Sequence, residues 1–76
     1  MKEINLFDVS VKTAIRIMME GTEYDQFQKL SKALDMPKST FQSALDKDSL
    51  RVRDLLKIAE FLGYNVILEK KEEINS

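Results

Sequence analysis

The chain has 76 residues, enough for one small domain, and 43% of them are hydrophobic and 33% charged. It contains neither cysteine nor histidine, which excludes a disulfide framework and thiolate metal sites and removes the commonest general base. The net charge of −1 gives no overall support for nucleic-acid binding, so any such support must come from the distribution of charge.

The first predicted helix starts at about Asp8 or Ser10 and ends at Glu20. One face of it carries apolar residues at helical spacing, namely Val11, Ala14, Ile15 and Met18. Gly21 is expected to stop it. Thr22 is then a suitable N-cap for a second helix, which we expect to end near Leu34.

A turn is predicted over Asp35, Met36 and Pro37. Asp35 stands where a left-handed residue is needed, which Asp tolerates although Gly would adopt it at less cost. Pro37 favours an extended Met36 and suits the first turn of a third helix, expected over residues 37–46.

The fourth predicted helix covers about Val52 to Leu62, with a wide apolar arc and Gly63 as its stop. Residues 64–69 alternate and contain β-branched side chains, which predicts a short strand. Because a single strand is unstable in water, it should pair with residues 3–7 or with the same strand of a second chain. Residues 70–76 are charged and are expected to form a flexible tail.

The whole chain is therefore expected to be one domain with its core at about residues 8–69. Residues 27–45, FQKLSKALDMPKSTFQSAL, are its most informative stretch. They predict two short amphipathic helices joined by a tight turn, which is the layout of a helix-turn-helix. Positive charge is concentrated around it, because residues 29–57 hold seven bases and four acids, whereas the rest of the chain holds five and nine.

From about Thr13 to Leu68 the chain resembles the lambda-repressor-like helix-turn-helix family, of Cro and phage-repressor type. The likeness rests on the two-helix unit and on LLKIAEFLGYNVIL at residues 55–68. It implies an all-α domain of four or five helices, here with a short C-terminal β-strand. The chain departs from the family at Asp35, where Gly is usual, at Pro37, and at Phe27, where a Gln is frequent. Gln26 or Gln28 would have to replace that Gln.

The resemblance implies that the third helix enters the major groove of DNA. The residues that would contact base edges are Lys38, Ser39, Gln42 and Ser43. Those that would contact phosphates are Thr40, Lys47, Arg51, Arg53, Lys29 and Lys32. The alternative for each of these residues is that it is an ordinary solvated surface residue without a role in DNA binding. The predicted strand supplies the candidate dimer contacts, Tyr64, Val66 and Leu68.

The expected function is that of a sequence-specific transcriptional regulator of phage or bacterial type, most simply a repressor. Its expected partners are palindromic double-stranded DNA and a second copy of the chain. The alternative is a protein-interaction module on the same fold, such as an antitoxin or a phage inhibitor resembling anti-CRISPR proteins. We expect no enzyme activity, cofactor or metal. The apolar runs are too short for a bilayer and the N-terminus lacks the apolar region of a signal peptide, so a cytoplasmic location is expected.

Overall fold

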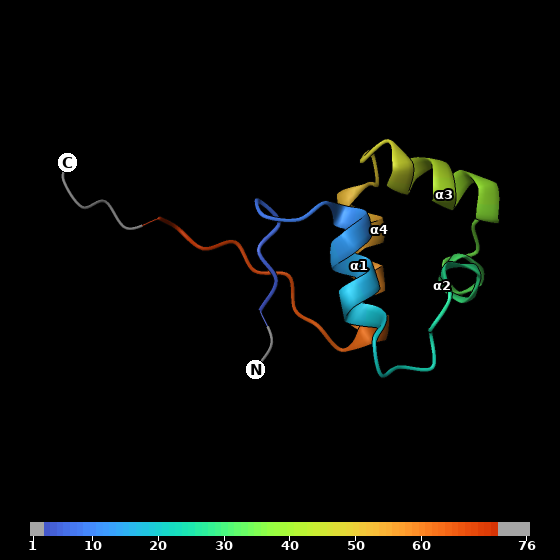
Figure 1. The fold of residues 1–76 in the computed structure, drawn as a ribbon, viewed down its shortest axis with the longest axis horizontal. Coiled ribbons are helices and arrows are strands. Elements are labelled where there is room, and N and C mark those ends of the chain that lie inside the picture. Colours follow the sequence, from blue (N-terminus) through green and yellow to red (C-terminus); the bar gives the residue numbers. More distant parts are fainter. Residues whose placement is uncertain (1–2, 72–76) are drawn as a thin grey trace.

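A computed structural model describes residues 3–71, which form an all-α domain of four helices (Figure 1). In chain order the helices are α1 (Val11–Met19), α2 (Phe27–Ala33), α3 (Lys38–Asp46) and α4 (Val52–Leu62). The prediction of a helical domain is confirmed, and the bounds of α4 are those expected. No helix within residues 3–71 has the length and apolar character needed to cross a bilayer.

Helix α1 begins at a capped residue and ends before Gly21, as expected. The hydroxyl of Ser10 accepts a hydrogen bond from the backbone N–H of Thr13 at 3.2 Å, which satisfies one of the free amides of the first turn. Gly21 has φ of +76°, so the chain reverses there at little steric cost.

Helix α2 begins four residues later than expected, because its N-cap is Gln26 and not Thr22. The Thr22 hydroxyl donates to the carbonyl oxygen of Met19 at 2.8 Å and accepts from the N–H of Tyr24 at 3.1 Å. Thr22 therefore stabilises the turn after α1, and such local bonds compete with helix formation. Gln26 precedes the first residue of α2 in an extended conformation, without a side-chain cap.

The turn between α2 and α3 has the expected left-handed residue at Asp35, with φ of +58°. The N–H of Met36 donates to the carbonyl of Ser31 and that of Asp35 to the carbonyl of Lys32, at 2.9 and 3.0 Å. This pair of bonds is the Schellman arrangement that ends many helices. Pro37 lies just outside α3 as its N-cap, one residue from the predicted start.

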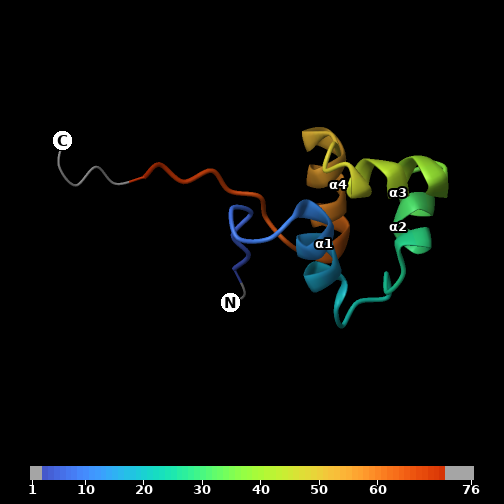
Figure 2. The ribbon, with the colours of Figure 1, turned by 45° about the horizontal axis from the view of Figure 1, so that its top comes forward.

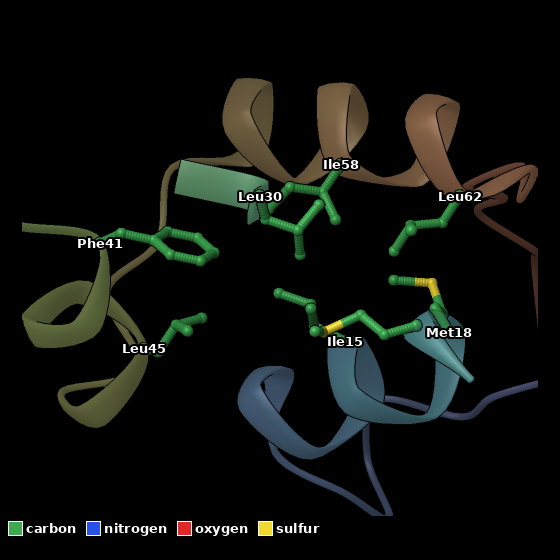
Figure 3. Packing of buried hydrophobic residues seen from close by; sticks show 8 residues of the cluster. Ile15, Met18, Leu30, Phe41, Leu45, Ile58 and Leu62 are labelled. Atoms are coloured by element: carbon green, nitrogen blue, oxygen red, sulfur yellow. The ribbon is translucent and has the colours of Figure 1, made fainter. Parts of the chain in front are cut away.

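All four helices contribute to one apolar core (Figure 3). Ile15 of α1, Leu30 of α2, Phe41 of α3 and Ile58 of α4 are completely buried. The side chains meet from four directions, so the core fixes the angle between the helix-turn-helix unit and the α1–α4 pair. Ser31 is also buried, and its small side chain allows α2 and α3 to approach closely.

The predicted strand at residues 64–69 is absent, and no strand occurs in residues 3–71. Residues 65–71 instead leave the helices as an extended segment, on the side away from α2 and α3 (Figures 1 and 2). The expected partner segment is unsuitable, because residues 5–8 form a turn in which the N–H of Asp8 donates to the carbonyl of Asn5 at 3.0 Å. Most of the predicted tail, residues 72–76, lies outside the described part of the chain.

Candidate nucleic-acid interface

The four residues predicted to contact bases all lie on α3, on the side away from the core. Phe41 and Leu45 define the inner face of the helix, being 0% and 3% exposed. Lys38, Ser39 and Ser43 are exposed and Gln42 is half-buried. The outward face of α3 therefore offers one cation, two hydroxyls and one amide, groups that can each hydrogen-bond to base edges.

A hollow of about 600 Å³ lies beside this face, where α1, α2 and α3 meet. Lys38 and Gln42 line it from α3, whereas Ser39 and Ser43 do not. The other lining residues belong to α1, to the following loop and to the start of α2, and are Arg16, Met19, Glu20, Gly21, Asp25, Gln26, Phe27 and Gln28. The fold thus gathers an arginine, a lysine, three glutamines and the two acids Glu20 and Asp25 around one depression of the surface.

Arg16 is the member of this group that the sequence did not single out. Its guanidinium carbon lies 5.4 Å from the centroid of the Phe27 ring, within the range of a cation–π contact. The Phe27 ring packs edge-on against Phe41, with 6.0 Å between the centroids. Phe27, which departs from the family pattern, therefore holds a cation beside the start of α3. The only local signal was a basic residue within the helix VKTAIRIMM, which has a second one at Lys12.

The predicted phosphate contacts lie on several elements. Five of the six residues are exposed and have no ion pair within residues 3–71, namely Thr40, Lys32, Lys47, Arg51 and Arg53. Lys29 is engaged differently, because its Nζ lies 2.7 Å from Oδ1 of Asp25 and 3.3 Å from the carbonyl oxygen of Glu23. This hydrogen bond and charge hold the pKa of Asp25 below its ordinary value. Lys29 would have to leave Asp25 in order to contact a phosphate.

The C-terminal end of α3 is joined to α1 by an ion pair. The Nζ of Lys12 lies 2.7 Å from Oδ1 of Asp46, and this hydrogen bond lowers the pKa of Asp46. A hydrogen bond from the side chain of Gln42 acts in the same direction. Gln42 lies one turn before Asp46 on α3.

The three candidate dimer residues lie where α4 ends and the chain leaves the domain. Tyr64 is half-buried and packs against the core, whereas Val66 and Leu68 are 42% and 98% exposed. Within residues 3–71, no group of three or more acidic, histidine or cysteine side chains is arranged to hold a metal ion.

Comparison with protein-family models, with curated proteins and with solved structures gave no match to this chain. The arrangement of residues described above therefore carries the functional argument.

Proposed function

We propose that this protein is a sequence-specific DNA-binding transcriptional regulator of phage or bacterial type, a cytoplasmic repressor that acts as a homodimer. The observation that carries the proposal is the α2–turn–α3 unit. Its turn is closed by two backbone bonds, its two helices pack through the buried Ser31, and α3 presents polar groups outwards. A lambda-repressor-like helix-turn-helix domain uses such a unit to place its second helix in the major groove.

In this proposal α3 is the recognition helix, and Lys38, Ser39, Gln42 and Ser43 contact base edges. Lysine can donate to O6 and N7 of guanine, and the amide of Gln42 can bond to adenine. The amide of Gln42 offers a carbonyl oxygen as acceptor and an N–H as donor, the two groups that such a contact needs. A well-formed base contact of this kind discriminates by about 1–3 kcal/mol.

The cations around α3 would fix the position of the domain on the DNA backbone. Lys47, Arg51 and Arg53 follow the recognition helix in the chain, and Arg16 lies beside its start. Phosphate contacts of this type supply affinity that falls with salt and carry no sequence information.

A dimer doubles the number of contacts and explains why one small domain can bind an operator specifically. Two recognition helices related by a twofold axis would lie about 34 Å apart, one turn of DNA, on a palindromic site. Tyr64, Val66 and Leu68 are the proposed dimer contacts. They begin at the end of α4, away from α2 and α3, so both functions can operate together (Figure 2).

The second candidate function is that of a protein-interaction module, such as an antitoxin or an anti-CRISPR-like inhibitor. It is favoured by exposed large apolar side chains outside the helix-turn-helix unit, Phe7 at 90% and Ile67 at 76%. Surface of this kind often marks a protein contact.

Fluorescence anisotropy tests the proposal, with duplex DNA from upstream of the chain's own reading frame and a scrambled duplex, each at two salt concentrations. We expect preferential binding to the upstream DNA that weakens with salt. The double variant Gln42→Ala/Ser43→Ala should lose the preference, whereas Lys57→Ala, which changes an exposed side chain of α4 outside both hollows, should keep it. Equal binding to both duplexes, or none, would refute the proposal and direct attention to a protein partner.

A further inference from the structure

The segment that follows α4 exposes three consecutive apolar side chains. We call residues 65–71 the C-terminal arm. Val66, Ile67 and Leu68 are 42%, 76% and 98% exposed, and their backbone forms no strand within the described chain. An extended segment with exposed apolar side chains and free backbone groups is unfavourable in water unless another surface covers it.

A hollow of about 430 Å³ lies next to the point where the arm begins. Ala59 and Gly63 of the α4 end have almost no side chain, and they lie in this hollow between Leu56 and Tyr64. Leu56 is 46% exposed, and Val52, one turn earlier, is 69% exposed. Residues four apart lie on the same helix face, so α4 carries an apolar stripe that leads into the hollow.

The arm and this stripe match in length and charge. From Val52 to Gly63 a helix extends about 16 Å at 1.5 Å per residue. Residues 66–71 cover a similar distance, about 16 Å, in an extended conformation. Glu60 is the one charged residue that lines the hollow. The apolar part of the arm is followed by Glu69, Lys70 and Lys71, so the end of the arm carries one net positive charge.

A chain does not fill its own hollow, because its arm leads away from it. Asn65 and Val66 form part of the wall, and the arm then extends outwards from the helices (Figures 1 and 2). The end of the arm contacts the N-terminal turn, because the Nζ of Lys71 lies 5.7 Å from the centroid of the Phe7 ring. Each chain thus has one empty hollow and an arm whose Ile67 and Leu68 side chains are uncovered. Two chains related by a twofold axis can bury both arms in both hollows, which closes the assembly at two copies.

We propose that the protein dimerises by arm exchange, with Ile67 and Leu68 of each copy lying in the α4 hollow of the other. The inference rests on the dimer in the proposed function and specifies its contact as arm against helix, in place of arm against arm. It assigns roles to Val52, Leu56 and Glu60, which had none.

Cysteine cross-linking tests the contact, since the natural chain has no cysteine. Leu56→Cys and isotope-labelled Leu68→Cys are mixed, oxidised and analysed by mass spectrometry under denaturing conditions. We expect the mixed disulfide to exceed both like-with-like disulfides by several-fold. Predominance of the Leu68→Cys homodimer would overturn the inference in favour of paired arms. A disulfide within one chain of a Leu56→Cys/Leu68→Cys double variant would overturn it in favour of an arm that folds back.

Sedimentation equilibrium supplies the second measurement. The natural chain should be dimeric at tens of micromolar, whereas Leu68→Asp should sediment as a monomer and keep the helical circular dichroism spectrum of the natural chain. The matched control is Leu6→Asp, which places the same charge on another exposed apolar residue and should remain dimeric. A monomeric natural chain that binds its operator would refute arm exchange alone. A dimer cross-linked between residues 56 and 68 without DNA preference would refute the regulator function alone.

Discussion

The ammonium group of Lys12 lies 2.7 Å from a carboxylate oxygen of Asp46, and this ion pair joins α1 to the last residue of the proposed recognition helix. The two residues are 34 positions apart in the chain. The side chains are 30% and 53% exposed, so solvent screens their attraction. The pair therefore matters mainly for geometry, because it holds the C-terminal end of α3 against α1. Asp46, its acidic member, lies one turn after Gln42 on α3.

The first prediction concerns the titration of Asp46. The substitution Lys12→Met should raise the pKa of Asp46 towards its ordinary value of 3.8, because the hydrogen bond and charge of Lys12 lower that pKa in the natural chain. A lowered native pKa stabilises the fold above the unfolded pKa, and this stabilisation is lost as the pH falls through the native pKa. The natural chain should therefore be more stable than the variant near neutral pH, and the difference should vanish in acid.

Carbon-detected NMR titration of the carboxyl groups would measure both effects. Asp25 is the internal control, since its pKa is lowered by Lys29 and should not change in Lys12→Met. High salt should reduce the stability difference. An Asp46 pKa that is the same in the two proteins would show that the ion pair does not form in solution.

The second prediction concerns Arg16. Arg16→Gln should weaken binding to the operator and to unrelated DNA by the same factor, because a phosphate contact carries no sequence information. Loss of one such contact should reduce the slope of log affinity against log salt by about 0.9 per monomer bound. Anisotropy titrations over a series of salt concentrations would give the slope.

Lys57→Gln is the matched control, because it removes one positive charge from the exposed side of α4. Its slope should stay close to that of the natural chain. If the two variants behave alike, Arg16 contributes only to the general charge of the domain and does not touch the DNA.

The third prediction concerns the core beneath α3. Phe41 is completely buried, so Phe41→Ala should lower the free energy of unfolding by about 3–5 kcal/mol. A domain of this size has about 4–11 kcal/mol in total, so the loss should be a large fraction of the stability. Urea denaturation followed by circular dichroism would measure the loss.

Phe61→Ala removes the same side chain from a position that is 40% exposed, where it stacks on Tyr24 at 5.8 Å. Its cost should be clearly smaller. Equal costs at the two positions would contradict the buried position of Phe41.

Local patterns were sufficient to predict most of the helices. The bounds of α4 follow from its wide apolar arc and from Gly63, which adopts φ of +81° at its end. The start of α2 could not be predicted in this way, because Thr22 has an N-cap side chain and uses it to bond to Met19. The Thr22 side chain can either cap a helix that follows it or bond back to the turn that precedes it, and the local sequence does not decide between the two.

Features that depend on contacts between segments distant in the chain could not be predicted from the sequence. A strand at residues 64–69 needs a partner strand, and the turn at residues 5–8 removes the one expected in the same chain. The outward face of α3 followed from the helical period, and the structure places Lys38 and Gln42 on it as predicted. The place of Arg16 beside them depends on how α1 packs against α2, which no local pattern encodes.

The last prediction concerns the turn at Asp35, whose φ of +58° is unfavourable for a residue with a Cβ atom. Asp35→Gly should raise the free energy of unfolding by a few tenths to about 1 kcal/mol, because the relief of backbone strain exceeds the added freedom of the unfolded chain. Asp35→Val should lower it by about 1–2 kcal/mol. Lys32→Gly is the control, because Lys32 lies within α2, where glycine should lower the free energy of unfolding by about 1 kcal/mol. Thermal unfolding of the set would test this order, and a stabilised Asp35→Val would contradict the left-handed turn on which the α2–α3 unit depends.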